Sequence, residues 1–278
     1  MRERCHCGKR KSSLEPSCPG CTRETLKETN LHPSPNTNNK NVSFLSNCFN
    51  FSSGLPIFYL AQLLIIVSPF LYTLTNFSLS WVTFVSALAI LGVSIFAQRN
   101  AFIKIGLLHD HELIYSGERH RLASSAFVHA GAFHLLFNLL ALISFGRALE
   151  GYFIWRFDGI GAFYYSALII IGAFLTGALQ YIGERYLGYT PSLGASALVL
   201  LIVSTTIVLD PNQIILLLFI PLPGWLFLSL FTSLTVFSML KGSKKIDAVM
   251  TFGTGRINHL GHLTGLLSGI ALGLLLLP

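Results

Sequence analysis

Charged residues are scarce in this chain, and that scarcity excludes most soluble proteins. Only 11% of the 278 residues are Asp, Glu, Lys or Arg, whereas a soluble domain carries about 25%. Apolar residues make up 52% of the chain, and the mean hydropathy is +0.62. This balance excludes a disordered protein, a coiled coil and an ordinary soluble enzyme. It predicts an all-α, multi-pass integral membrane protein, which we expect in the plasma (inner) membrane.

Acidic residues are fewer than basic ones: the chain has 12 Asp and Glu against 19 Lys and Arg. The net charge of +7 could indicate nucleic-acid binding, but the basic residues form no dense run. Eight of them precede Pro56, as expected for a cytoplasmic tail beside an anionic membrane. We therefore expect the lipid bilayer, and no nucleic acid, among the partners.

Cysteine is also rare, and four of the five cysteines lie close to the N-terminus. These four are Cys5, Cys7, Cys18 and Cys21, spaced as C-x-C-x10-C-x2-C. Two close pairs with a spacer have the ligand spacing of a small structural zinc site. Two disulfides are the alternative, which a secreted chain would favour. The fifth cysteine, Cys48, stands alone.

The distribution of apolar residues divides the chain into four regions. Residues 1–24 form the cysteine-rich, zinc-ribbon-like module, and residues 25–56, rich in Asn, Ser, Thr and Pro, form a flexible linker. Residues 57–80 contain an extra N-terminal transmembrane helix, and residues 81–278 contain a six-helix core. The apolar segments expected to be helical are Ile57–Thr75, Trp81–Ala97, Ala123–Ala148, Gly161–Ile182, Gly194–Asp210, Trp225–Leu240 and Ile257–Leu277.

Two segments between these helices are too polar or too short to span a bilayer. Residues 98–121 alternate charged with apolar side chains, which indicates an interfacial loop with short amphipathic pieces. Asn212–Pro223 is apolar but short, and it is closed by Pro221 and Pro223. We interpret it as a connection that dips into the membrane.

Four polar residues lie in the apolar helices, where such side chains are costly and mark candidate functional sites. His134 and Asn138 are four residues apart, so a helix places both on one face. Ser196 stands at the start of a short helix, and His262 stands in the last one. Taken singly, each has an ordinary explanation, since such a serine usually bonds its own backbone and a lone histidine is usually a core residue.

Glycines recur every fourth residue along the last helix, at Gly261, Gly265, Gly269 and Gly273. Such a stripe is usually a packing device that lets another helix approach closely. Small residues flank Ser196, so its helix is the expected partner. Contact between the two helices would bring Ser196 within reach of His262, a base able to activate the hydroxyl. His134, Asn138 and the Ser196 backbone N–H could then stabilise an oxyanion.

Two alternative chemistries find no support in the sequence. A zinc protease would need an H-E-x-x-H motif, which does not occur. A catalytic triad would need an acidic residue, and the last helix contains none, so a Ser–His dyad is expected. Two further histidines are weaker candidates: His129 is expected to cap a loop, and His259 to lie at a helix mouth.

From Trp81 to Leu277, the chain resembles the rhomboid family of intramembrane serine proteases. The resemblance rests on G-E-R-H-R, H-A-G-A-F-H-L-L-F-N, F-G-R-A-L-E, G-A-S, I-P-L-P-G and I-N-H-L-G-H-L-T-G-L-L-S-G, in the family's order. It implies a six-helix rhomboid-like core. It also implies a serine-type endopeptidase that needs no cofactor for catalysis and cleaves the transmembrane helices of membrane-protein substrates.

The resemblance also assigns roles to individual residues. By matching motif, Ser196 would be the nucleophile and His262 the base, with His134 and Asn138 as oxyanion donors. Arg121 and Glu150 match positions that are structural in the family.

Three positions depart from the family's usual pattern. Ala197 follows the serine where the family usually has Gly, Leu200 replaces an aromatic that often packs on the histidine, and His120 replaces a Trp. None of these changes removes a catalytic atom, so an active protease is expected. The alternative is a catalytically inactive relative that binds or routes transmembrane clients.

Overall fold

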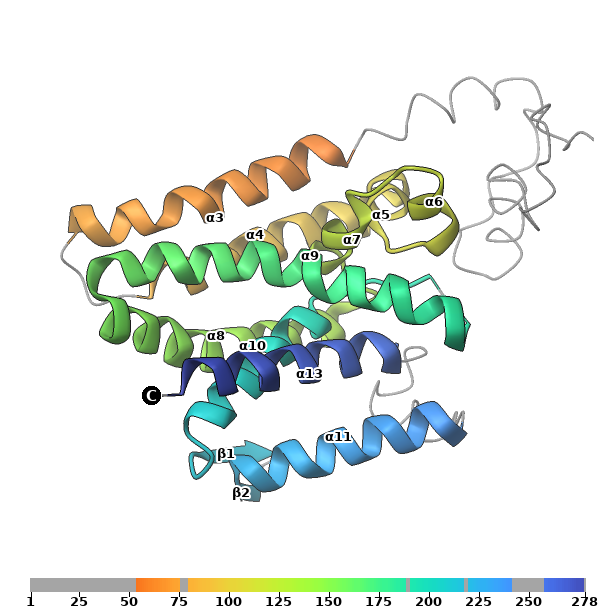
Figure 1. Ribbon diagram of the computed structural model, residues 1–278. Helices are drawn as coiled ribbons and strands as arrows, with labels where there is room; N and C mark the ends of the chain where they lie inside the picture. Colours follow the sequence, from red (N-terminus) through yellow and green to blue (C-terminus); the bar gives the residue numbers. More distant parts are fainter. Residues whose placement is uncertain (1–53, 76–79, 189–190, 218–219, 242–257, 278) are drawn as a thin grey trace, which may run out of the picture.

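The computed structural model describes residues 54–75, 80–188, 191–217, 220–241 and 258–277. Its long helices lie side by side in one bundle (Figure 1). They are α3 (Leu55–Thr75), α4 (Trp81–Arg99), α8 (Ala132–Phe157), α9 (Gly161–Leu187), α10 (Ser196–Leu209), α11 (Gly224–Lys241) and α13 (His259–Leu276). The mostly helical architecture that the composition predicted is confirmed.

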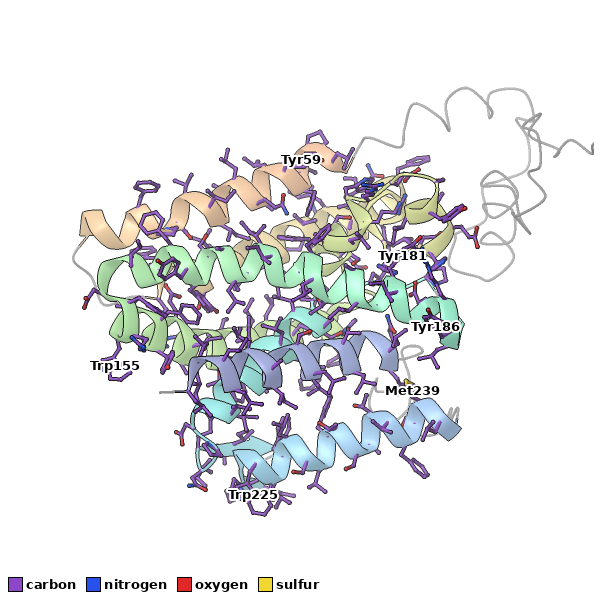
Figure 2. The ribbon with its side chains drawn as sticks, in the orientation of Figure 1. Tyr59, Trp155, Tyr181, Tyr186, Trp225 and Met239 are labelled. Carbon is purple, nitrogen blue, oxygen red and sulfur yellow. The ribbon has the colours of Figure 1, made fainter. Side chains whose placement is uncertain are left out.

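The long helices have the features of an integral membrane protein. In the described part of the chain, three stretches are long and apolar enough to cross a membrane: Trp81–Arg99, Ala132–Leu187 and His259–Leu276. Shorter apolar helices cover Leu55–Phe70, Ser196–Leu209 and Gly224–Leu240. Exposed aromatic side chains stand at both ends of the bundle, Trp155 and Trp225 at one and Tyr186 at the other (Figure 2), where membrane interfaces favour them. The number of spans, and α3 as a span, stay predictions.

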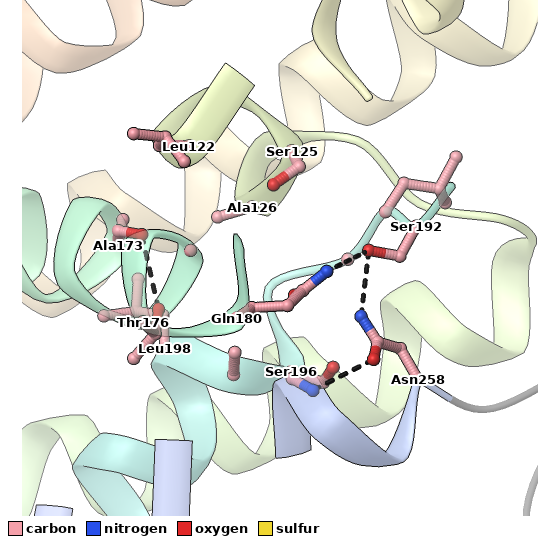
Figure 3. A pocket seen from close by; sticks show the side chains of 15 residues that line it. Leu122, Ser125, Ala126, Ala173, Thr176, Gln180, Ser192, Ser196, Leu198 and Asn258 are labelled. Carbon is pink, nitrogen blue, oxygen red and sulfur yellow. Dashed lines mark hydrogen bonds between the residues drawn. The ribbon is translucent and has the colours of Figure 1, made fainter. Parts of the chain in front are cut away.

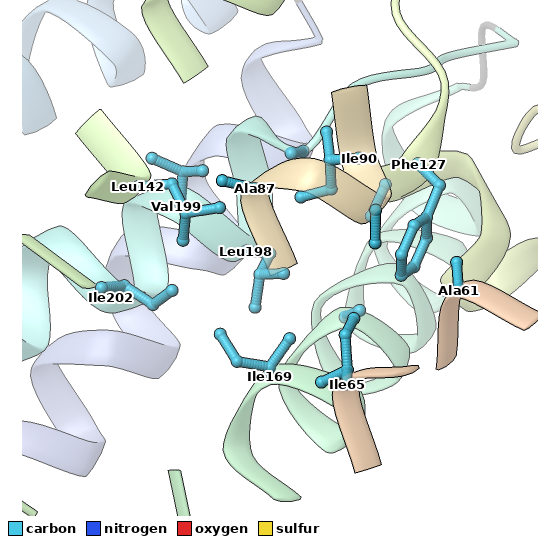
Figure 4. Packing of buried hydrophobic residues seen from close by; sticks show 14 of the residues in the cluster. Ala61, Ile65, Ala87, Ile90, Phe127, Leu142, Ile169, Leu198, Val199 and Ile202 are labelled. Atoms are coloured by element: carbon cyan, nitrogen blue, oxygen red, sulfur yellow. The ribbon is translucent and has the colours of Figure 1, made fainter. Parts of the chain in front are cut away.

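Helix α10 is the most enclosed element of the bundle. All of its residues from Leu198 to Ile207 are buried, and it packs against α8, α9 and α13. Figure 4 shows Val199 and Ile202 among side chains contributed by neighbouring helices. In a bilayer, such close packing rather than hydrophobic exclusion holds helices together. The start of α10, where Ser196 lies, is therefore held in a fixed place.

The segment expected to be an interfacial loop folds into short helical pieces. They are α5 (Ala101–Leu107), α6 (His111–Tyr115), α7 (Arg121–Ser124) and the 3-10 turn η2 (Ser125–Phe127). The side chains of Asn100 and Asp110 cap α5 and α6 by accepting backbone N–H groups. The buried guanidinium of Arg121 donates to the carbonyl oxygens of Ile105 and Leu108, both at 2.7 Å. Arg121 thus ties α7 to the C-terminal end of α5.

The short connection between α10 and α11 is a β-hairpin. Strands β1 (Ile214–Leu217) and β2 (Ile220–Pro223) pair antiparallel, with Ile214 opposite Pro223. Ile214, Leu216 and Ile220 are exposed, which suits the predicted contact of this connection with the membrane.

Both predicted boundaries of the third helix were wrong. The helix expected over Ala123–Ala148 begins at Ala132, because η2 and the extended Gly131 separate it from α7. It continues to Phe157 because Glu150 does not end the span. The buried Glu150 carboxylate instead accepts the N–H groups of Val82 (3.0 Å) and Thr83 (2.9 Å) and so caps α4.

The helix expected from Gly194 begins only at Ser196. Gly194 has a φ of +132°, a left-handed conformation that a helix cannot use and that favours glycine.

The cysteine-rich module and nearly all of the linker lie outside the described residues. The zinc site at Cys5, Cys7, Cys18 and Cys21, and its disulfide alternative, stay predictions.

Candidate active site

Ser196 and His262 come together at the start of two adjacent helices. Helix α13 begins beside Asn258, whose side chain accepts the Gly261 N–H at 2.9 Å and whose carbonyl accepts the His262 N–H at 3.1 Å. The Oγ of Ser196 lies 2.9 Å from the Nε2 of His262. With the ring proton on Nδ1, Nε2 accepts the hydroxyl hydrogen, as a general base must.

The buried Nδ1 of His262 has no hydrogen-bond partner among the described residues. The arrangement is therefore a pair, without the acidic third member of a triad.

The glycine stripe of α13 faces α10, as the sequence predicted. A Cβ atom at Gly265 would collide with the backbone carbonyl of Ala197, and one at Gly269 would collide with that of Leu201. The hydroxyl of Thr205 donates to the Gly269 carbonyl at 3.0 Å. Because these glycines have no side chains, α13 can approach α10 closely, and this contact brings His262 next to Ser196.

His134 and Asn138 lie one turn apart near the start of α8. The His134 ring packs against Gly194, where a Cβ atom would stand 3.0 Å from its Nε2, so it borders the segment that leads into Ser196. The Asn138 Nδ2 donates to the His134 carbonyl at 2.8 Å, which uses one of its two amide hydrogens. Among the described residues, no hydrogen bond joins either side chain to Ser196 or His262.

His129 lies in a place that the sequence did not predict. It is buried, and its Nε2 accepts the backbone N–H of Ala195 at 3.1 Å. Its ring packs edge-on against His134, with centroids 5.1 Å apart. His129 was expected to cap its own loop, but its ring instead bonds to the residue before Ser196.

A pocket lined by both polar and apolar residues adjoins Ser196 (Figure 3). Its Ser192 Oγ accepts from Gln180 Nε2 at 3.1 Å and from Asn258 Nδ2 at 2.9 Å. Because Asn258 caps α13, this network connects α9, the segment before Ser196 and the helix that carries His262. The sequence contained a signal for it that we missed, since Gln180 is an amide inside an apolar helix.

The His262 ring also contacts an aromatic side chain of α11. The centroids of His262 and Phe231 lie 6.2 Å apart, and Phe231 stacks on Phe227 at 5.8 Å. Leu200, where the family often has an aromatic, is buried within α10. The aromatic neighbour of His262 thus comes from a different helix than the resemblance implied.

Within the described residues, no group of three or more His, Cys, Asp or Glu side chains could hold a metal ion. This finding does not extend to the four N-terminal cysteines, which lie outside those residues.

Comparison with known proteins identifies the family of the chain. No curated protein matches the chain. The rhomboid domain family matches residues 116–278, which make up more than half of the chain and run from α7 to α13. The matched part includes Ser196 and His262 as well as His134 and Asn138. The chain therefore belongs to the rhomboid family and is a rhomboid-like integral membrane protein.

Proposed function

We propose that this rhomboid is an intramembrane serine endopeptidase that cleaves the transmembrane helices of membrane-protein substrates. The observation that carries the proposal is the 2.9 Å contact between Ser196 Oγ and His262 Nε2. Family membership supports it, because rhomboids are typically intramembrane serine proteases.

The reaction proceeds through an acyl-enzyme. Ser196 Oγ attacks the scissile carbonyl while His262 Nε2 takes the hydroxyl proton, and His262 then gives that proton to the leaving amine. Water next attacks the ester carbonyl, with His262 again as base. Proton return to Ser196 Oγ releases the new carboxyl end and regenerates the enzyme.

The oxyanion of each tetrahedral intermediate needs nearby donors. The first backbone N–H groups of a helix have no partner within that helix, and Ser196 is the first residue of α10. His134 borders this point, and Asn138 keeps a second amide hydrogen beyond the bond to its own helix. One such donor lowers the barrier by about 3–4 kcal/mol.

Hydrolysis inside a bilayer also needs water. The polar side chains of Gln180, Ser192 and Asn258 in the pocket beside Ser196 can hydrogen-bond water. The substrate would be a helix that unwinds locally, since helical hydrogen bonds shield a peptide bond. Small or helix-breaking residues near the cleavage site would ease that step.

A second candidate function is a catalytically inactive rhomboid that binds or routes transmembrane clients. The observation in its favour is Ala197, which lines the pocket next to Ser196 where the family usually has Gly. An added methyl here narrows the site without removing a catalytic atom.

Cleavage by the full-length protein in liposomes, with a panel of single transmembrane helices as substrates, separates the two functions. Ser196→Ala and His262→Ala should each abolish cleavage and labelling by a fluorophosphonate probe. Ser229→Ala is the matched control and should change neither, because Ser229 is exposed on α11 and bonds its own helix. Undiminished cleavage by Ser196→Ala would refute the protease. Client binding without cleavage or labelling in the wild type would favour the second function.

A further inference from the structure

Besides the Ser192 side chain in the polar network, the backbone of the segment that leads into Ser196 is anchored at three points. Ser192 exchanges two backbone hydrogen bonds with His109, at 2.9 and 3.0 Å, and the Gly194 N–H donates to a backbone carbonyl at 2.9 Å. The third anchor is the bond from the Ala195 N–H to His129 Nε2, at 3.1 Å. Of the three, only this one depends on a side chain, so substitution can remove it alone.

His129 is itself fixed by α4. The Ser94 Oγ lies 2.9 Å from His129 Nδ1 and 3.0 Å from the Phe127 carbonyl, and Gln98 Nε2 donates to the His129 carbonyl at 3.1 Å. Both ring nitrogens and the backbone carbonyl of His129 thus have partners. The side chains that hydrogen-bond to His129 thus come from α4, whereas α8, which follows it in sequence, contributes only the packing of His134.

These bonds fix the protonation of His129. A backbone N–H can only donate, so Nε2 must accept from Ala195 and carry no hydrogen. Since Ser94 gives its own hydrogen to the Phe127 carbonyl, His129 Nδ1 must donate to Ser94 Oγ. The ring is therefore neutral, with its hydrogen on Nδ1. Burial, with a smaller effect from nearby His134, lowers the pKa of His129 to about 3, which agrees with a neutral ring.

Without His129, the Ala195 N–H would be a buried donor with no partner. Ala195 is only 1% exposed and precedes the first turn of α10. A buried N–H without an acceptor costs free energy, so the backbone is expected to rearrange locally until this N–H finds another acceptor. The residue that would move first is the one beside it, Ser196.

We propose that His129 is a positioning residue for Ser196, which its neutral ring orients by holding the Ala195 N–H. This inference rests on the proposed protease function, because it assigns His129 a task in catalysis rather than in folding. His129 touches neither Ser196 nor His262 by any hydrogen bond among the described residues, so it acts through Ala195.

A matched pair of substitutions separates the two bonds of the ring. In His129→Gln the side-chain oxygen reaches about as far as Nε2 and can still accept from Ala195. In His129→Asn the shorter side chain can replace only Nδ1 and can still donate to Ser94. We expect His129→Asn to lower kcat about 10- to 100-fold at nearly unchanged KM, since small displacements of reacting groups have effects of this size. His129→Gln should restore most of that loss.

Amide hydrogen exchange at Ala195 provides a readout that does not need cleavage. The Ala195 amide should be protected in the wild type and in His129→Gln, and should exchange faster in His129→Asn. Equal exchange in all three proteins would overturn the proposal. So would a loss of activity that is the same in both variants and matches only the loss of folded protein.

Failure of the proposed function gives a different result. In that case the wild type shows no cleavage that Ser196→Ala abolishes, while Ala195 remains protected. His129 would then hold the segment without any task in catalysis, and the positioning role would be rejected together with the protease.

Discussion

At the scale of single residues, the His262 ring must be oriented without a carboxylate, because none among the described residues bonds to its Nδ1. The described contacts are the hydrogen bond to Ser196 Oγ, at 2.9 Å, and the ring of Phe231. The backbone of His262 is fixed by its N–H bond to the Asn258 carbonyl. In a triad the acidic residue holds the histidine ring in its orientation. In this dyad, packing around His262 must hold the ring instead.

Asn138→Ala tests the oxyanion role at this scale. We expect kcat to fall by about 100-fold, less than in Ser196→Ala, because the backbone N–H groups and His134 remain as donors. Ser86→Ala is the control, since Ser86 is also buried and bonds its own helix, to the Val82 carbonyl at 2.7 Å. Steady-state cleavage of one transmembrane substrate would measure both variants. If Asn138→Ala loses no more activity than Ser86→Ala, Asn138 is not an oxyanion donor.

The neutral state of His129 predicts a pH dependence of stability. Its pKa is about 3 in the folded protein against 6.5 for an unperturbed histidine. Below pH 6.5 the unfolded chain gains a proton at this residue that the folded protein does not, so stability falls as the pH falls from 6.5 toward 3. The slope approaches about 1.4 kcal/mol per pH unit. Tm measured in detergent should therefore fall more steeply with acidification in the wild type than in His129→Gln, and parallel curves would contradict this.

At the scale of elements, the contact between α10 and α13 determines the geometry of the site. Gly265→Leu or Gly269→Leu would push the helices apart, because a side chain at either position meets the backbone of α10. We expect the overpacked contact to lower the free energy of unfolding by about 1–3 kcal/mol or more. Cleavage should also be lost, because His262 would move away from Ser196. Thermal unfolding and substrate cleavage would measure the two effects.

Gly151→Leu is the matched control for this prediction. Gly151 also lies inside a long helix, but a Cβ atom there meets nothing within 4 Å. It should leave both Tm and activity near the wild-type values. Full activity in Gly265→Leu, together with an unchanged Tm, would show that the close approach is not needed.

The positions of the main helices could be predicted from the sequence because each is a continuous apolar run bounded by polar or helix-breaking residues. The start of α8 could not, since the turn before it is itself apolar and is held by tertiary bonds, such as Ser94 to the Phe127 carbonyl. The capping role of Glu150 could not be predicted from the sequence either. A carboxylate looks like the end of a span in sequence, but here it caps α4, whose first turn lies 67 residues away along the chain.

The candidate site was predictable where a repeated pattern carried it. The glycine stripe pointed to the contact that joins Ser196 and His262. The bond between His129 and Ala195 joins residues 66 positions apart with no repeat and no motif spacing, so only the folded chain reveals it. The same holds for Phe231, which reaches His262 from a helix of otherwise ordinary composition.

At the scale of the whole molecule, the candidate site lies toward one end of the bundle. Ser196 begins α10 and His262 lies near the start of α13, at the end where α5, α6 and α7 gather (Figure 1). The hairpin of β1 and β2 and the turn η3 (Asp158–Ile160) lie at the opposite end. A substrate helix would therefore be cut close to one membrane face.

Which face this is can be predicted from the basic residues. Helix α3 packs against α4 and α9 in the same bundle, and we expect it to span as they do. If the N-terminal tail is cytoplasmic, the tail, residues 98–121, Arg185 and residues 241–256 share one side with 17 of the 19 basic residues, and only Arg147 and Arg156 fall on the other. Basic residues in the short loops beside spans mark the cytoplasmic side, and those loops alone hold nine against two. The commonest six-helix arrangement that the family resemblance implies opens away from the cytoplasm, whereas a spanning α3 would invert the core.

We therefore predict that Ser196 opens toward the cytoplasm. In a variant whose native cysteines are all replaced, a single cysteine at Ser243 should resist a membrane-impermeant maleimide in intact cells and react after lysis. A cysteine at Gly159, in the turn η3 at the opposite end, should react in intact cells because the bundle places it on the other face. The pair controls for expression and reagent access, since each position reports one face. Labelling of Ser243→Cys but not Gly159→Cys from outside would show that the core has the common orientation and that α3 does not span.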